Sequence, residues 1–402
     1  MHTDPSSLPD HLQRPHVRPI HPIPVTKDGK QMIALRDPAM LSRQKMLVPH
    51  QVIPVLRQFD GNKHITEIAQ NLSVSQDQLI GLVQGLEKIG LLWGPTFEAL
   101  EEETRAEIAQ RGAFATPACA TLGESEESFR GFLSDYFDQT EDPELDSECT
   151  GIVAPHLDFQ RGWPNYATAY YPLREIDPPD RVVVLGTNHF GLGDGMTLTE
   201  FGFETPMGIC PADTEVVSKM TDLLGDSLVI DQLDHLAEHS IQVHIPWIQY
   251  CFGNVPIVAA LVPDPMIPMI KDDGERIELA PFTNALKGVL SDVKGSTFYI
   301  ASSDLSHVGP QFGEPLPVDD QRKFDVERHD RDMLGKFLDG DAEAFLSAMQ
   351  WSKNPTRWCS VGNMTALLQL KNESTLDLLD YRQACDEQGQ AMVSSAAIAL
   401  TV

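Results

Sequence analysis

The sequence has no long hydrophobic run and comparatively few basic residues. No window of 18 consecutive apolar residues occurs, so no segment is expected to cross a bilayer as a helix. Lysine and arginine total 30 against 59 acidic residues, which gives a formal net charge of -29. Binding a phosphate backbone or an anionic membrane requires a positively charged surface. We therefore expect neither nucleic acid nor membrane as a partner.

The sequence also lacks paired cysteine motifs. Its six cysteines form no CxxC pair and are expected to stay reduced, mostly as small buried hydrophobic residues; they are Cys119, Cys149, Cys210, Cys251, Cys359 and Cys385. The opening MHTDPSSLPDHLQRPH has neither the apolar core nor the small-residue cleavage site of a secretory signal. Together these features predict a cytoplasmic protein.

The length predicts more than one domain. At roughly 150 residues per domain, 402 residues suggest two or three. Residues 1–24 carry six prolines and are expected to form an extended arm. Residues 25–95 form the first predicted module, residues 96–124 an acidic linker, and residues 125–402 the main domain.

The pattern of residues 25–95 is typical of a small winged-helix module. PVTKDGKQMIALRDP predicts two short strands around the Asp28-Gly29 turn. From Met46 to Leu92 the period is helical, and it includes ITEIAQNL and SQDQLIGLVQGLEKIG. DNA recognition is one interpretation. However, the second predicted helix carries Asp77 and Glu87 but only one base, Lys88, so it lacks the positive charge needed to bind a phosphate backbone. Docking of a protein or peptide is the favoured one.

The stretch after this module is rich in acids. Residues 96–150 hold 15 acids and 3 bases. EALEEETRAEIAQR predicts a solvated helix and TPACATLGESEES a linker, whereas FRGFLSDYF has an apolar helical stripe and is expected to begin the main domain.

The main domain alternates strand and helix patterns. Four short runs rich in valine and isoleucine predict strands: GIVAPHLDF, RVVVLGTNHF, VPIVAALV and STFYIASSDLSH. Helical patterns such as TEVVSKMTDLLG and ELAPFTNALKGVL lie between them. This order predicts an α/β fold with a largely parallel sheet and helices on both faces. In such sheets, functional groups gather at the carboxyl ends of the strands.

Histidines end three of the predicted strands. They are His156 in APH, His189 in GTNHF and His307 in SSDLSH. A single histidine there is more often a satisfied polar residue of the core, but the ends of neighbouring strands converge. Imidazole is a common ligand of iron, copper and zinc. The pattern therefore favours a metal centre.

Other candidates for chemistry surround these histidines. Asp304 precedes His307 by three residues, and the pair could orient a ligand or transfer a proton, although Asp304 could instead cap a turn. The stretch DHLAEHSIQVHIPW adds His235, His239 and His244, with the first two at helical spacing. Cys359 is expected to open a helix, where the macrodipole favours a thiolate. A metal-binding thiolate and a buried small residue both remain open for Cys359.

Over roughly residues 125 to 402 the sequence resembles the Memo family. The resemblance rests on four blocks that occur in the order typical of that family, APH, LGTNHF, EHSIQVHIPWI and SSDLSHVG, and on a cysteine expected to open a late helix. The resemblance implies a fold similar to that of the class III extradiol dioxygenases. It implies one mononuclear metal ion held by His156, His189 and Cys359. Two imidazoles and one thiolate suit Fe(II) or Cu, with Zn also possible. Asp304 and His307 would then lie beside the pocket, and His239 and His244 near it.

The chain departs from the usual Memo pattern in two places. Many members read APHAGY where this chain reads APHLDFQRGW, which places Asp158 and Arg161 near the expected pocket mouth. Phe190 stands where a second histidine is usual. Both changes concern the surroundings of the expected ligands, so the substrate of a relative cannot simply be transferred.

Prokaryotic Memo proteins are often named after the AmmeMemoRadiSam trio, as its protein B. The resemblance therefore implies a radical-SAM partner, and residues 25–95 resemble the small peptide-binding domains that accompany radical-SAM maturases. Three functions follow as hypotheses. The first is a metal-dependent redox or dioxygenase-like enzyme, with acid–base candidates His239, His244, Asp304 and His307. The second is a metal carrier or sensor with the same ligands. The third is an adaptor that docks a peptide or protein through residues 25–95.

Overall fold

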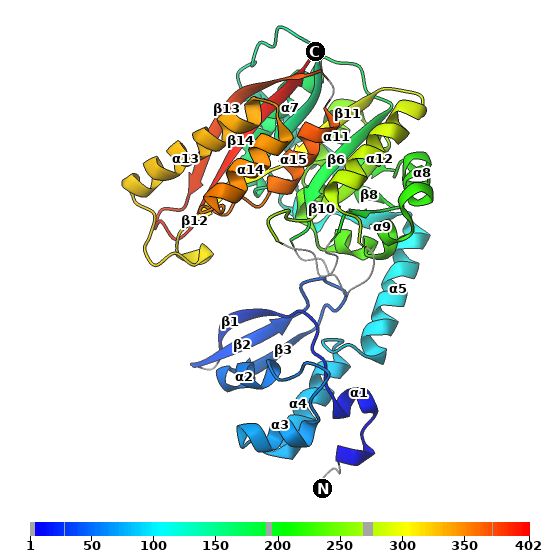
Figure 1. The fold of residues 1–402 in the computed structure, drawn as a ribbon, viewed down its shortest axis with the longest axis vertical. Helices are drawn as coiled ribbons and strands as arrows, with labels where there is room; N and C mark the ends of the chain where they lie inside the picture. The colour runs from blue at the N-terminus through cyan, green and yellow to red at the C-terminus, as the bar shows by residue number, and fades with distance from the viewer. Residues whose placement is uncertain (1–4, 28, 190–194, 268–275, 372) are drawn as a thin grey trace. The chain divides into compact units, whose positions relative to one another are not determined.

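The computed structural model describes residues 5–27, 29–189, 195–267, 276–371 and 373–402 (Figure 1). The chain divides into two compact units, Met1–Arg111 and Gly112–Val402. Phe190 lies outside the described residues. Each unit has a hydrophobic core of its own.

The smaller unit combines a three-stranded antiparallel sheet, in the order β1-β2-β3, with short helices. Its elements in chain order are η1 (Pro5–Ser7), α1 (Asp10–Gln13), β1 (His21–Lys27), β2 (Lys30–Arg36), β3 (Lys45–Pro49), η2 (His50–Val52), α2 (Ile53–Leu56), α3 (Ile65–Leu72), α4 (Gln76–Lys88) and α5 (Pro95–Arg111).

The sequence pattern predicts much of this unit correctly. The strands β1 and β2 pair down to Lys27 and Lys30, as expected for a tight turn. In α4, the buried residues Leu79, Val83 and Leu86 follow the helical period and pack into the core. The helix α5 is the predicted solvated helix.

Two local expectations differ from the structure. Residues 45–49 form β3 rather than helix, because their backbone pairs with β2. Residues 5–24 are not simply extended, since they include η1, α1 and the start of β1. Leu8 and Leu12 are buried in the core of the smaller unit, and this burial favours the short helix over an open arm.

The larger unit contains the following elements in chain order: β4 (Ala113–Ala115), η3 (Pro117–Leu122), α6 (Glu126–Asp138), β5 (Cys149–Ala154), α7 (Phe159–Tyr170), η4 (Tyr171–Arg174), β6 (Arg181–Thr187), β7 (Thr197–Leu198), β8 (Gly202–Thr205), β9 (Gly208–Cys210), α8 (Thr214–Leu224), α9 (Ser227–Ile230), η5 (Gln232–Leu236), α10 (His239–Gln242), α11 (Ile245–Phe252), β10 (Ile257–Val262), α12 (Leu279–Asp292), β11 (Thr297–Ser302), β12 (Asp304–Val308), η6 (Pro310–Phe312), α13 (Asp320–Leu338), α14 (Ala342–Ser352), α15 (Val361–Leu370), β13 (Thr375–Cys385) and β14 (Met392–Thr401).

The main sheet has the order β12-β14-β5-β11-β6-β10-β7, and β13 also pairs with β14. The four strands predicted from the valine- and isoleucine-rich runs, β5, β11, β6 and β10, are adjacent and parallel. The antiparallel strands β14, β12, β13 and β7 extend this core on either side, so the complete sheet is mixed.

Helices cover both faces of this sheet, as predicted. On one face, Val183 and Leu185 of β6 pack in a core with residues of α12 and α15, and Figure 1 shows α12, α14 and α15 in front of the strands. On the other face, a Cβ atom on Gly186 would meet Ile241 of α10. The alternation along β6 thus places one helix layer on each side.

The larger unit begins earlier than the sequence predicts. Residues 112–124, expected to be linker, form β4 and η3 and pack into this unit. The strand β4 pairs with β8, and Phe114 is fully buried against Phe203. Because β8 is so distant from β4 in the sequence, no local sequence pattern around residues 112–124 indicates this pairing. The predicted boundary at residue 125 therefore differs from the observed one.

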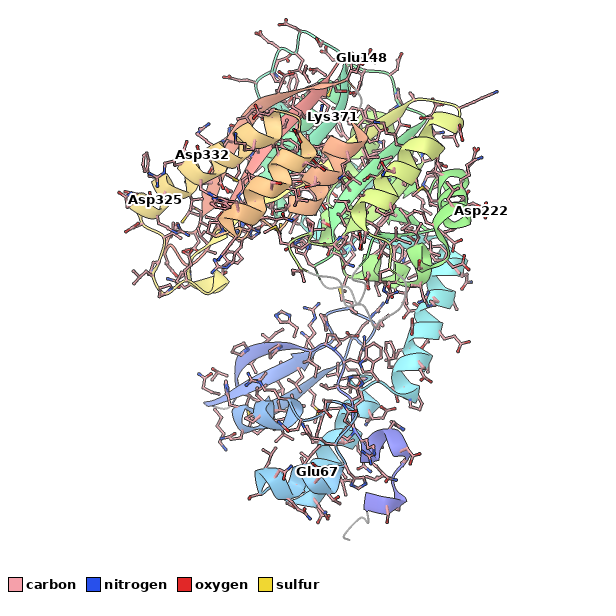
Figure 2. The ribbon with its side chains drawn as sticks, viewed as in Figure 1. Glu67, Glu148, Asp222, Asp325, Asp332 and Lys371 are labelled. Carbon is pink, nitrogen blue, oxygen red and sulfur yellow. The ribbon has the colours of Figure 1, made fainter. Side chains whose placement is uncertain are left out.

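Several charged side chains lie on the outside of the larger unit. Glu148, Asp222 and Asp332 are exposed and point outward in Figure 2. Among the described residues, no helix has the length and apolar character needed to cross a membrane.

Candidate metal centre

His156 follows the carboxyl end of β5 and is almost completely buried, with 2% of its surface exposed. Its Nδ1 lies 3.1 Å from Oγ of Ser302. That hydroxyl donates its own hydrogen to the carbonyl oxygen of Ser240 at 2.6 Å, so it accepts from the imidazole. Nδ1 therefore carries the proton, and Nε2 presents a lone pair to the interior of the site.

His189 lies just past the end of β6 and is held by Glu238. Its backbone N–H donates to Oε2 of Glu238 at 2.7 Å, and its Nδ1 lies 3.1 Å from Oε1. As in His156, this contact places the proton on Nδ1 and leaves Nε2 to face the site.

His239 is the first residue of α10, and its Nδ1 lies 3.3 Å from the same Oε1 of Glu238. The ring stacks on that of His189 with 5.0 Å between centroids. One carboxylate thus contacts two of the histidines. Burial opposes its ionisation, but the hydrogen bond from His189 and the two neighbouring imidazoles lower the pKa of Glu238 to about 2.

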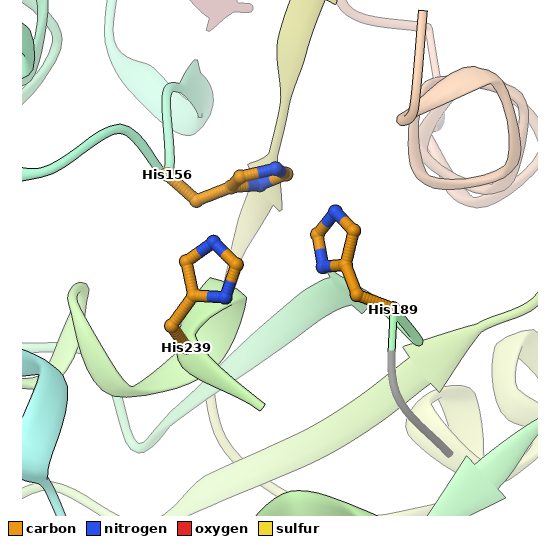
Figure 3. Close-up of side chains that lie close together, drawn as sticks. All are labelled: His156, His189 and His239. Atoms are coloured by element: carbon orange, nitrogen blue, oxygen red, sulfur yellow. The ribbon is translucent and has the colours of Figure 1, made fainter. Parts of the chain in front are cut away.

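The three histidines converge (Figure 3). One ligand atom from each lies within 4.8 Å of the others, and among the described residues this is the one such group of three or more possible ligands. Three imidazoles held by orienting hydrogen bonds suit a transition-metal ion. His239, expected from the sequence to take part in proton transfer, supplies the third nitrogen of this cluster.

Cys359 lies at the edge of the histidine cluster. Its Sγ is 3.3 Å from Nε2 of His156, and it also interacts with His189. The helix α15 begins at Val361 with Ser360 at its N-cap, so Cys359 immediately precedes the helix rather than opening it. The thiol is close enough to the cluster for Cys359 to remain a predicted ligand.

The electrostatics favour a positive charge at this position. Burial by itself lowers the pKa of His189, but the hydrogen bonds with Cys359 and Glu238 outweigh burial and raise it well above its usual value. A metal cation between the same groups would take the place of that proton. The residues present therefore fit a bound metal ion.

Asp304 and His307 face the same side of the sheet because of a β-bulge. Asp304 lies opposite Ser395 and His307 opposite Val393, so β12 has one residue more than β14 between these pairs. In a regular strand, residues three apart would point to opposite faces. Oδ1 of Asp304 accepts the backbone N–H of His156 at 2.9 Å.

Both side chains have shifted acidities. Burial raises the pKa of Asp304 to about 7 and lowers the pKa of His307 to about 4. Nδ1 of His307 donates to the carbonyl oxygens of Leu305 and Arg357, at 3.0 and 3.1 Å. Nε2 of a neutral His307 is therefore the nitrogen that could accept a proton.

The structure does not bring His244 or His235 to the site surface. His244 is fully buried, and its Nδ1 lies 2.8 Å from the hydroxyl of Tyr170. His235 is also fully buried and packs against Phe114 and Phe203. The acid–base role of His244 stays a prediction.

A cavity of about 480 Å³ opens onto the histidine cluster. Its walls combine polar and apolar side chains and are formed by Ala118, His156, Leu157, Asp158, Arg161, His189, His239, Val243, Asp304, His307, Phe312 and Val393. Asp158 and Arg161 lie at this cavity, as the departure from the APHAGY pattern implied, and they form an ion pair with 2.6 Å between Nε and Oδ2. The pocket therefore combines apolar walls with a charged ion pair.

Sequence reasoning missed Glu238 and Ser302, which orient the histidines. The signal available for Glu238 was an acid directly before His239, but an adjacent pair does not reveal that the carboxylate also reaches His189. Ser302 ends β11, where a serine is equally suited to a turn.

The fold and the site define an α/β protein with a histidine cluster at the carboxyl ends of parallel strands. The sequence matches the family model described as Memo-like protein over residues 115–399. The chain therefore belongs to the Memo family.

Curated relatives support this assignment. A MEMO1 family protein of Aquifex aeolicus is 24% identical over 86% of this chain and 90% of its own length. One from Thermus thermophilus is 27% identical over 77% of this chain and 88% of its own length. One from Methanopyrus kandleri is 29% identical over 61% of this chain and 80% of its own length.

Proposed function

We propose that this chain is a redox-active metal protein with one metal ion, Fe(II) or Cu, held by His156, His189 and the Cys359 thiolate. The observation that carries the proposal is the 3.3 Å approach of Cys359 Sγ to Nε2 of His156, at the edge of the histidine cluster. His239 would be a further ligand or a neighbour of the ion. A bound iron or copper ion would supply one-electron redox chemistry.

The chain's own residues would bind and orient a substrate in the adjoining pocket. Leu157, Val243 and Phe312 offer apolar contact, and Arg161 offers a cation. Nε2 of His307 would accept a proton from the substrate, because burial keeps this imidazole neutral near pH 7. Asp304, with its raised pKa, would hold or return a proton at the same wall.

Copper spectroscopy tests the redox proposal. Protein loaded anaerobically with copper is oxidised and then reduced again while the Cu(II) resonance is followed. We expect one signal per chain that appears and disappears reversibly, and a different signal in Cys359→Ser. A copper ion that does not change oxidation state, or identical signals in both proteins, would contradict the proposal.

A non-catalytic metal carrier or sensor is the alternative with the same ligands. Its support is the near-complete burial of His156, since a shielded ligand set also suits storage. Oxygen consumption by the metal-loaded protein separates the two. Uptake above that of His156→Ala supports an enzyme, and equal uptake supports a carrier.

We also propose that residues 25–95 dock a radical-SAM protein or a peptide. Support comes from β1, an edge strand of the small sheet whose residues are mostly exposed and therefore accessible to a partner. Titration of the full chain with a purified radical-SAM protein from the same genome tests this directly. Saturable binding is expected, and its absence would remove the proposal for that partner.

A further inference from the structure

Asp330, on α13, is a buried carboxylate outside the metal centre. It has no exposed surface, whereas Asp332 on the same helix is exposed at the outer surface (Figure 2). A carboxylate in the interior is costly unless hydrogen bonds replace its water. The partners of Asp330 therefore indicate what its burial achieves.

Four neutral donors surround this carboxylate, and they come from four separate segments. Oδ1 accepts from the hydroxyl of Ser306 at 2.5 Å and from the indole N–H of Trp358 at 2.8 Å. Oδ2 accepts from the hydroxyls of Tyr381 at 2.8 Å and Ser394 at 2.5 Å. Asp330 thus joins β12, β13, β14 and the segment before α15.

Two of these donors build the β-bulge that presents Asp304 and His307. Ser306 is the residue between them whose backbone N–H donates to Oγ of Ser394 at 2.9 Å, in place of a regular ladder bond. Both hydroxyls, of Ser306 and Ser394, then donate to Asp330. The carboxylate therefore fixes the irregular stretch from the side opposite the pocket.

The third donor, Trp358, directly precedes Cys359. Its backbone is held by the side chain of Asn354, which accepts from the Trp358 N–H and donates to the Trp358 carbonyl, both at 2.8 Å. Asn354 and Arg357 have φ values of 45° and 59°, a left-handed conformation that asparagine tolerates but that is strained for the long side chain of Arg357. The indole bond to Asp330 supplies an anchor next to the thiol.

We propose that Asp330 is a positioning residue for the metal centre: through Ser306 and Trp358, it sets the places of His307 and Cys359 relative to His156. It contacts neither metal nor substrate. The proposal rests on the proposed function where it concerns Cys359 as a ligand.

Cobalt substitution of the full chain tests this role. A Co(II)–thiolate absorption band reports the sulfur ligand, and chelator competition reports affinity. We expect Trp358→Phe and Asp330→Asn to bind Co(II) about tenfold or more weakly. We also expect both to shift or weaken the thiolate band. If Asp330→Asn does not fold, Trp358→Phe supplies the measurement alone.

Two variants separate positioning from general destabilisation. Tyr381→Phe removes a donor to the same carboxylate from β13, which carries no site residue, and Asp332→Asn changes an exposed carboxylate on the same helix. Both should keep the wild-type band and affinity, whatever their melting temperatures. The proposal is overturned if folded Asp330→Asn or Trp358→Phe also keeps both, or if Tyr381→Phe loses them equally.

The two proposals fail in different ways. If wild-type protein binds Co(II) without a thiolate band, Cys359 is not a ligand and that part of the proposed function is wrong. The affinity comparison still decides the role of Asp330, because the bulge that it anchors also carries Asp304, whose Oδ1 accepts the backbone N–H of the ligand His156.

Discussion

Glu238 holds His189 at two points: it accepts the backbone N–H at 2.7 Å and contacts Nδ1 at 3.1 Å. The same carboxylate lies 3.3 Å from Nδ1 of His239. One acidic side chain thus orients two nitrogen donors that come from different segments. Second-layer contacts of this kind set the tautomer and direction of metal-binding imidazoles.

Glu238→Gln should weaken metal binding although all the proposed metal-binding side chains remain in place. The amide keeps the volume but loses the charge and one acceptor, so we expect affinity to fall roughly 10–100-fold. Competition with a chromogenic chelator measures this. Glu215→Gln on α8, whose carboxylate is exposed, is the matched control and should bind as the wild type does. Unchanged affinity in Glu238→Gln would show that the histidines orient themselves without it.

His307→Gln should separate metal binding from proton transfer. We expect the variant to keep its full metal content. The rate of oxygen-dependent turnover should fall by about 10²–10⁴-fold, because this is the usual contribution of a positioned acid–base group. An oxygen electrode and elemental analysis of the same sample provide both values. His329→Gln on α13 is the control. Loss of metal in His307→Gln would instead mark this residue as a ligand.

His235 should make the protein less stable in mild acid. Burial lowers its folded-state pKa to about 3 from a usual value of 6.5, so between these values the unfolded chain binds the extra proton. The stability that His235 contributes is complete above pH 6.5 and is lost as pH falls towards 3, by up to about 1.4 kcal/mol per pH unit. Urea unfolding at pH 4.5 and 6.0 should show a smaller loss for His235→Leu. Parallel pH dependences in wild type and variant would contradict this account.

The alternating strand pattern was enough to predict the parallel core and the meeting of His156 and His189. Each of the strands β5 and β6 is a short apolar run, and because both pair in parallel with β11, their carboxyl ends lie at the same edge of the sheet. The histidines that follow these two strands in the sequence were therefore the most specific indication of where the site lies.

The remaining features depend on contacts that local sequence does not encode. The bulge between Asp304 and His307 exists because β12 pairs with β14, which lies almost at the end of the chain. The pairing of β4 with β8, which moves the start of the larger unit to Gly112, is equally distant. Asp330 looks in the sequence like any other acid of a charged helix, and only the folded chain brings its four donors around it.

The central claim is that the histidine cluster binds a metal ion, and elemental analysis of anaerobically purified and metal-loaded protein tests it most directly. We expect about one iron or copper ion per chain in the wild type and none in His156→Ala. His329→Ala and Cys251→Ala should keep the full amount. Absence of metal from the loaded wild type, or its retention in His156→Ala, would contradict the account.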